Sequence, residues 1–396
     1  MQYDLAAWLN LSLRWLHVIA GIAWIGASFY FVWLDNNLQA PEPSADGVKG
    51  ELWAVHGGGF YNSRKYIEAP PRMPDTLHWF KWEAYTTWLS GFGLLCLIYY
   101  AGAPTYLIDP AKAQLGWAQA VAIGLSFIVG GLLAYEALCR SPIGTRPRLF
   151  GLIWFAILTA SAWGLTRLFS DRGAFIHVGA MVGTVMVANV LLVIIPNQRK
   201  SVAALIAGTP VDPRWGAQGK QRSVHNNYMT LPVIFMMLST HYPLVTGNSL
   251  NWLLLAMISL AGVSIRHFFN LRHQGLFRHE FIFCGVVLMF AASIIATGVG
   301  SSVNLPASGP TNFAQAQAIV QTHCIVCHST TPTHRGFTAP PLGVTFDTPE
   351  RLRSFAPRIY QMAVATRAMP LGNETGMTDQ DRARLGAWIK AGAAGP

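Results

Sequence analysis

The residues with the clearest chemical signature lie near the C-terminus, where Cys324, Cys327 and His328 form a C-x-x-C-H motif. In this motif the two thiols add to the vinyl groups of a haem, and the adjacent imidazole reaches the iron. A thioredoxin-like redox pair needs a βαβ context that the sequence lacks. A zinc site needs a second ligand pair, for which only His323 and His334 are near. The motif therefore predicts one covalent haem c, with His328 as an axial ligand of the iron.

The segment around this motif, residues 313–396, contains the elements that would position it. Residues 313–323 read as a helix that runs into the motif. Residues 378–381 read TDQD, a capping-box-like start for a helix that continues to Lys390 with Trp388 on its apolar face. In these features the segment resembles the class I cytochromes c over its whole length, a family whose terminal helices pack on each other.

The resemblance to the cytochromes c implies the remaining ligands of the haem. The sixth ligand should be a methionine in the second half, since Met/His ligation raises the reduction potential. Met362, Met369 and Met377 are available. Met369 is followed by Pro370 in a loop-like stretch, RAMPLGN, which resembles the distal methionine loop of the family, so the resemblance implies Met369. It also implies that a carbonyl of the segment 340–342 fixes the proximal histidine.

The composition of the whole 396-residue chain indicates a membrane protein. Hydrophobic residues make up 52% and charged residues 12%, whereas soluble proteins average about 25% charged. The formal net charge is +10, but the basic residues stand singly between apolar segments and form no runs interleaved with aromatic residues. We therefore expect a lipid bilayer around the chain and no nucleic-acid partner.

Residues 1–300 are expected to form an all-α bundle of about eight transmembrane helices. A span needs about 20 mostly apolar residues, because the hydrocarbon core is about 30 Å thick. The stretches that qualify, of which the second is short and the sixth is interrupted by prolines, are 11–34, 84–101, 117–138, 149–169, 173–196, 226–245, 250–270 and 280–300. A Ser/Pro/Gly linker, 301–312, separates this predicted membrane domain from the predicted cytochrome c domain, 313–396.

The distribution of Lys and Arg predicts the orientation of the bundle. Four alternate loops, including the long loop 35–83, hold sixteen of these residues with their helix ends, whereas the other loops hold three. Because basic loops stay in the cytoplasm, the N-terminus and the C-terminal domain are expected on the periplasmic side of a bacterial inner membrane. Attachment of haem c also takes place outside the cytoplasm, so an unrelated argument places residues 313–396 on the same side.

Ionisable residues within the predicted spans are candidates for function, because burying them in a membrane is costly. His17 and His177 lie at matching depth toward the periplasmic side, and Arg14 precedes His17 on the same helix face. Since bundles build cofactor sites from histidines on facing helices, we expect His17 and His177 to hold a non-covalent haem b, with Arg14 near a propionate. Ordinary hydrogen-bonded packing residues are the alternative. The reserve ligands, for this haem or a second inner one, are His241, His267, His78 and His225.

The loop 35–83 mixes glycine, aromatic and basic residues in a way that suits binding of a flat anion. It contains VHGGGFYNSRKY, in which His56, Arg64 and Lys65 are the first candidates for catalysis and substrate binding. Three glycines let the backbone approach a ligand, a cation binds its charge, and aromatic rings stack on its face. The alternative is a plain juxtamembrane loop with glycine turns and interfacial tryptophans.

The chain as a whole is similar to the membrane-bound urate hydroxylases. The similarity rests on the opening LRWLHVIAGIAWIGASFYFVWLDN, on HGGGFYNSRKY and on the C-terminal haem segment, and it covers essentially the whole chain. It implies that the protein oxidises urate to 5-hydroxyisourate in purine breakdown. It also implies that the electrons pass to the attached haem and on to a downstream respiratory acceptor, so that hydrogen peroxide is not formed.

Two other functions are compatible with the same residues. One is a quinol–cytochrome c type of electron-transfer protein without purine chemistry, and the other is a membrane anchor or transporter that carries a cytochrome. The glycine, aromatic and basic loop favours the urate enzyme. If urate is oxidised at the cytoplasmic face, electrons must cross a core about 30 Å thick to reach haem c. Either a haem b relays them, or the substrate binds near the outer face.

Overall fold

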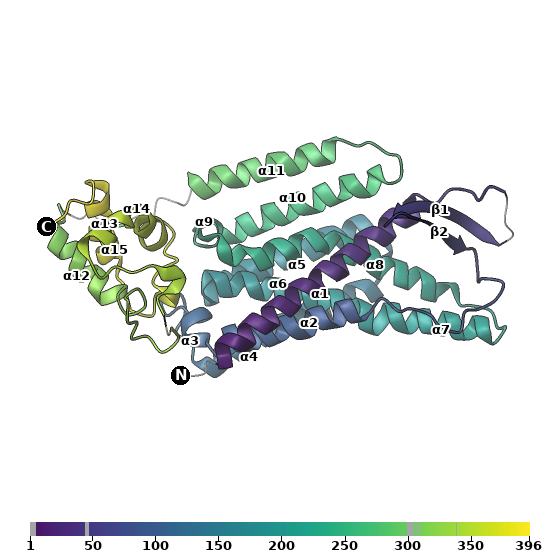
Figure 1. The fold of residues 1–396 in the computed structure, drawn as a ribbon, viewed down its shortest axis with the longest axis horizontal. Coiled ribbons are helices and arrows are strands. Elements are labelled where there is room, and N and C mark those ends of the chain that lie inside the picture. The colour runs from purple at the N-terminus through teal and green to yellow at the C-terminus, as the bar shows by residue number, and fades with distance from the viewer. Residues whose placement is uncertain (1–4, 44–46, 299–304, 307–308, 338) are drawn as a thin grey trace.

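A computed structural model shows a long helical bundle with a small helical domain at one end (Figure 1). It describes all residues except 1–4, 44–46, 299–304, 307–308 and 338. The regular elements of the described residues are helices, apart from a hairpin in which β1 (Val48–His56) pairs antiparallel with β2 (Gly59–Tyr66). The expectation of an all-α protein is therefore wrong for part of the loop 35–83, where the backbone forms a two-stranded sheet.

Long helices form the bundle, and short helical turns join them. The long elements are α1 (Leu5–Asn36), α2 (Trp82–Leu94), α4 (Trp117–Arg140), α5 (Pro147–Leu168), α6 (Asp171–Ala188), α7 (Ile195–Ile206), α8 (Pro213–Leu238), α10 (Asn251–Arg272) and α11 (Glu280–Thr297). The short elements are the π-helical turns η1 (Leu95–Tyr100) and η3 (Asn189–Ile194), the 3₁₀ turns η2 (Pro142–Thr145) and η4 (Ser239–His241), and the helices α3 (Ala103–Tyr106) and α9 (Pro243–Thr246).

Six helical segments of the described chain are long and apolar enough to cross a membrane, whereas we expected about eight spans. They are α1, α4, α5, α6 with η3 and α7, α10, and His279–Thr297. The expected span 84–101 is divided between α2, of 13 residues, and the turn η1. The expected span 226–245 begins inside α8, which carries many polar residues, and is interrupted after Leu238 by η4 and α9.

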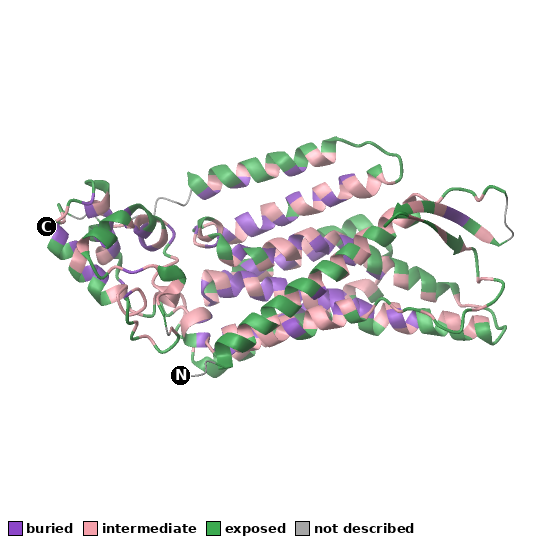
Figure 2. Ribbon diagram, viewed as in Figure 1, coloured by how far each residue is buried: buried purple, intermediate pink, exposed green. Residues whose placement is uncertain are grey.

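Helix α6 is the centre of the bundle. It contacts α4, α5, α8 and α2, and residues on all of its sides are buried, among them Phe175, His177, Met181 and Val185. Figure 2 shows that burial falls off outward, so that α1 and α11 are largely exposed. Most of their exposed side chains are apolar, as expected for surfaces that face lipid.

Contacts between loops show that the chain crosses the bundle back and forth. At the end next to the C-terminal domain, Lys112 pairs with Asp171, whose carboxylate also accepts a 2.6 Å hydrogen bond from Asn251. At the end that carries the hairpin, Gln221 donates to the carbonyl of Gly144 at 2.7 Å. The loops with many basic residues therefore meet at the hairpin end, and the loops with few meet at the other end. Which end faces the cytoplasm stays a prediction.

The C-terminal domain is built from short helices around a core of its own. The elements are α12 (Phe313–His323), η5 (Pro341–Gly343), α13 (Pro349–Ser354), α14 (Ala356–Ile359), η6 (Tyr360–Ala365), η7 (Leu371–Asn373) and α15 (Asp379–Lys390). Helices α12 and α15 pack against each other, with the rings of Phe313 and Trp388 6.1 Å apart in an edge-to-face arrangement. Thr378 and Asp381 form the capping box that starts α15. The two helices expected from the sequence are thus confirmed.

Candidate functional site

The C-x-x-C-H motif follows α12 directly, so the helix fixes the direction in which the motif leaves it. Cys324 and Cys327 are free thiols, and burial raises the pKa of Cys324 to about 12, with Cys327 adding to the effect. Burial also raises the pKa of Cys327. Both side chains are therefore neutral thiols at neutral pH. The described residues contain no group of three His, Cys, Asp or Glu side chains placed to hold a metal ion.

The imidazole of His328 is held by a carbonyl on its inner nitrogen. Its Nδ1 donates to the carbonyl of Val344 at 3.0 Å, and the ring contacts that of Phe346. The acceptor therefore lies just beyond the segment 340–342 that we expected to supply it, because that segment forms the turn η5. Since Nδ1 carries the proton, Nε2 keeps a free lone pair, as an axial ligand requires.

The loop that carries Met369 is fastened by a buried arginine. Arg382, only 3% exposed, donates to the carbonyls of Met369, at 2.8 Å, and Ala363, and to the side chain of Asn373 at 3.0 Å. Burial lowers the pKa of Arg382 to about 10, so it remains a cation at neutral pH. Met369 packs against the same core as Cys324. Hydrogen bonds within the chain therefore hold the loop of Met369 in place without a bound ligand.

The C-terminal domain rests on the adjacent end of the bundle. A methyl group at Gly372 in η7 would lie 2.9 Å from the carbonyl oxygen of Ile108 and 3.1 Å from that of Thr105. A methyl group at Gly247 would collide with the carbonyl oxygen of Thr366. The backbone of the C-terminal domain therefore contacts the backbone of the bundle at two places, one of them at α3 and the residues that follow it.

The histidines expected to hold a membrane haem lie in separate recesses. Nδ1 of His17 contacts the carbonyl of Thr87 on α2 at 2.9 Å, and a methyl group at Gly91 would lie 2.7 Å from its ring. His177 instead donates from Nδ1 to the carbonyl of Gly173 at 2.7 Å, and its Nε2 faces Gly124 on α4. These contacts share no residue, because α2 lies between α1 and α6. Each ring therefore has its own hydrogen-bond partner, and a haem b held by His17 and His177 stays a prediction.

Arg14 does not accompany His17. It is exposed, and its Nε donates to the side chain of Asn10, one turn earlier on α1, at 3.2 Å. His17 faces α2 at the same time, so the two side chains point to different partners. The expected pairing of Arg14 with a propionate beside His17 has no support in these contacts.

The hairpin carries His56, Arg64 and Lys65 on exposed positions. Arg64 pairs with Glu51 across the hairpin at 3.0 Å, and Lys65 pairs with Asp35 at the end of α1 at 2.7 Å. His56 precedes the turn. The structure therefore does not bring these three side chains into one pocket, and their role in catalysis stays a prediction.

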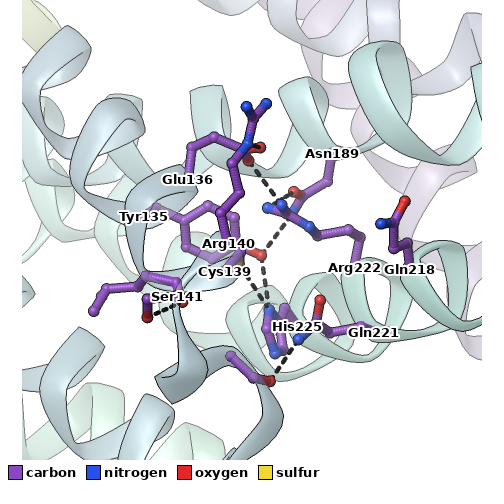
Figure 3. A network of polar contacts seen from close by, with 12 residues as sticks. Tyr135, Glu136, Cys139, Arg140, Ser141, Asn189, Gln218, Gln221, Arg222 and His225 are labelled. Carbon is purple, nitrogen blue, oxygen red and sulfur yellow. Dashed lines mark hydrogen bonds and ion pairs between the residues drawn. The ribbon is translucent and has the colours of Figure 1, made fainter. Parts of the chain in front are cut away.

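An ion pair between a buried arginine and a partly buried glutamate links α8 to α4 (Figure 3). Nη2 of Arg222, a residue only 5% exposed, lies 2.8 Å from Oε2 of Glu136, and its Nη1 donates to Oδ1 of Asn189 at 3.2 Å. The guanidinium also lies over the ring of Tyr135, 5.2 Å from its centroid. Glu136 accepts a second bond from the exposed Arg140. Both charges are therefore paired within the chain, although Nε of Arg222 is buried without a hydrogen-bond partner among the described residues.

A chain of hydrogen bonds continues from this ion pair. Nδ2 of Asn189 donates to the hydroxyl of Tyr135 at 2.9 Å, which leaves that hydroxyl to donate to Nδ1 of His225 at 2.8 Å (Figure 3). The His225 ring stacks on Phe150 with the centroids 4.2 Å apart. Asn189 begins the π-helical turn η3, a feature often found at functional sites. The cluster therefore joins a neutral histidine to a buried tyrosine.

Most of this polar cluster is not predicted from the sequence, since Arg222, Tyr135, Glu136 and Asn189 are not among the candidate residues given above. The signal that could have revealed it is the run RSVHNNY at residues 222–228. Such a polar run inside a bundle requires partners on neighbouring helices.

The fold defines a bundle of membrane-length helices with a small helical domain attached at one end. The chain belongs to the urate oxidase N-terminal family, whose model matches residues 3–297. That match runs from the first helix to the end of α11 and stops before the C-terminal domain. No curated protein and no solved structure matches the chain. Membership of the family indicates a urate-related oxidoreductase function for the bundle.

Proposed function

We propose that the protein is a membrane-bound enzyme that oxidises urate to 5-hydroxyisourate and uses a haem c of its own C-terminal domain as the electron acceptor. The family match over residues 3–297 is the observation that carries the urate chemistry. The C-x-x-C-H motif beside a loop anchored by Arg382 supports the choice of acceptor. The alternative of a quinol-driven protein has no comparable support.

The reaction balances without oxygen. Urate and one water give 5-hydroxyisourate, two electrons and two protons, and the new hydroxyl oxygen comes from water. A haem in the C-terminal domain accepts electrons one at a time, so each urate supplies two successive transfers. Hydrogen peroxide is not a product of this stoichiometry. The electrons leave for a downstream respiratory acceptor.

The chain supplies four groups to the proposed haem c. Cys324 and Cys327 form the two thioether bonds, for which free, neutral thiols are suited. His328 presents Nε2 to the iron, since its Nδ1 is engaged with Val344. Met369 is the proposed second axial ligand. In this proposal residues 313–396 form a cytochrome c domain on the periplasmic side of the membrane.

One anaerobic spectrum tests the proposed function. The full-length protein is purified in detergent, oxidised, and mixed with urate or with a quinol while the haem absorption is recorded. We expect urate to reduce the haem at two equivalents per urate and to yield 5-hydroxyisourate. Reduction by quinol and not by urate would replace this proposal with the electron-transfer alternative. Reduction by neither would leave a membrane anchor or transporter.

A further inference from the structure

An arginine without a counter-ion is buried on α10, toward the end of the bundle that carries the hairpin. Arg266 is 4% exposed and forms no ion pair with a carboxylate of the described residues. Its Nε donates to Oδ1 of Asn227 at 3.0 Å, but its Nη2 is buried and has no hydrogen-bond partner among the described residues. Burying a cation without a counter-charge at such a position is strongly unfavourable. This points to an anion supplied from outside the chain.

A pocket of about 440 Å³ opens beside Arg266, between α1 and α10. Aromatic rings form most of its wall, and its lining residues are Phe29, Tyr30, Trp33, Arg266, Phe269 and His273. The guanidinium carbon of Arg266 lies 3.8 Å from the centroid of the Phe29 ring. A cation on an aromatic wall suits a flat, conjugated anion better than a compact one such as phosphate.

The side chains around the guanidinium leave further polar atoms unused. Oδ1 of Asn227 is occupied by Arg266 and by Nδ2 of Asn270, at 3.0 and 2.8 Å. Three further polar atoms are buried without a hydrogen-bond partner in the part of the chain that the structure describes: Nδ2 of Asn227, Oδ1 of Asn270 and Nδ1 of His273. The group therefore offers donors and acceptors at once. A purine-like edge, on which N–H and C=O groups alternate, needs this combination.

We propose that this pocket is the binding site for the urate anion, with Arg266 donating to the negatively charged edge and the rings of α1 enclosing the flat face. The inference deepens the proposed function and rests on it for the identity of the anion. It places the substrate at Arg266 and not at the hairpin, because Arg64 and Lys65 already pair with carboxylates. Arg266 has no such pair among the described residues.

Equilibrium dialysis with radiolabelled urate tests the pocket directly, on the full-length protein in detergent. We expect Arg266→Gln to weaken urate binding at least tenfold, and Phe29→Ala to weaken it about three- to tenfold through loss of ring contact. Arg266→Lys keeps the charge and should lose less than Arg266→Gln. The matched control is Arg272→Gln, which removes an exposed arginine from the same helix and should bind within twofold of the parent protein. Haem content and thermal unfolding show that each variant is folded.

The outcomes separate this inference from the proposed function. If urate reduces the haem of the parent protein and both Arg266→Gln and Phe29→Ala bind urate normally, the pocket assignment is overturned and the function stands. If the His56→Ala, Arg64→Ala double variant alone loses binding, the site lies on the hairpin and the inference is equally wrong. If inorganic phosphate or anionic lipid vesicles displace urate as well as unlabelled urate does, the pocket is a lipid-phosphate site. If the parent protein binds urate through Arg266 but never reduces its haem, the inference stands and the proposed function fails.

Discussion

Nε2 of His177 lies against the backbone of Gly124, so close that a methyl group at position 124 would be 2.6 Å from that nitrogen. The histidine is fully buried, and the ring of Tyr100 contacts it from η1. Two turns further along α4, the missing side chain of Gly131 likewise leaves room for Met181. The absence of side chains at these glycines therefore sets how closely α4 and α6 approach.

This relationship predicts the effect of adding one methyl group to α4. We expect Gly124→Ala to destabilise the bundle by about 1–3 kcal/mol, because the backbone and a buried ring must move apart. Gly130→Ala is the matched control, since no atom would lie within 4 Å of its methyl group. Thermal unfolding in detergent measures both. An unchanged unfolding temperature for Gly124→Ala would show that His177 is not held against α4.

We expect a larger loss of stability when the carboxylate that pairs with Arg222 is replaced by an amide of the same shape. Glu136→Gln leaves a buried guanidinium without its counter-charge, which typically costs about 3–5 kcal/mol. Arg140→Ala removes the exposed partner of the same carboxylate and should cost less than about 1 kcal/mol. Denaturant or thermal unfolding distinguishes the two. Equal effects from both variants would mean that Arg222 is compensated elsewhere.

The proposed second axial ligand can be checked by its absorption. Met369→Ala should remove the charge-transfer band of methionine–iron ligation while the haem remains covalently attached. Met362→Ala should keep that band. Met377 is 3% exposed in the core of the domain, so Met377→Ala should lower stability and also keep the band. If the band survives in Met369→Ala and disappears in another variant, that other methionine is the ligand.

Through its hydrogen bonds, Arg382 should link the order of the Met369 loop to the reduction potential of the proposed haem. Arg382→Leu removes hydrogen bonds to the carbonyls of Ala363 and Met369, so we expect loss of at least about 2 kcal/mol of domain stability. The loosened loop should also weaken the methionine band and lower the reduction potential. Arg384→Leu, an exposed neighbour on α15, serves as the control. A stable Arg382→Leu variant with an unchanged potential would contradict this role.

The number of haems per chain indicates where urate is oxidised. Fifteen residues of α10 separate Arg266 from Asn251, about 22 Å along the helix axis. Direct electron transfer over that gap is too slow for turnover. If urate is oxidised in the Arg266 pocket, pigment analysis should therefore find a second, extractable haem beside the covalent one. A single haem per chain would restrict that pocket to binding and place the oxidation near the outer end of the bundle.

The first and last helices of the C-terminal domain, α12 and α15, could be predicted because their signals are local. Asn312 and Thr378 cap helices that begin at the next residue, and the haem motif itself is contiguous. The hairpin was missed for the opposite reason. Gly57 and Gly58 have positive φ and form the two-residue turn between β1 and β2, but glycines in a row were interpreted as room for a ligand.

The polar clusters of the bundle depend on contacts that no spacing reveals. Arg222 lies inside α8 and Arg266 inside α10, and neither is recognisable from its sequence position as part of a cluster. Their partners come from distant segments, Glu136 for one and Phe29 for the other. The pairing of His17 with His177 stays a prediction, because matching depth does not specify which face of a helix a side chain occupies. Helix order within the bundle is a tertiary property.

Helix α8 has a consequence for the way the protein is made. It is not among the described helices apolar enough to cross a membrane, and it buries Arg222, Asn226 and Asn227. A single arginine at the centre of a span costs about 2.5–3.5 kcal/mol during insertion, so this segment is a poor substrate for the translocon by itself. It must enter the bilayer together with α6 and α10, which cover its polar groups. Biogenesis of the bundle is therefore cooperative, and variants such as Glu136→Gln should reduce the amount of inserted protein before they affect any measured activity.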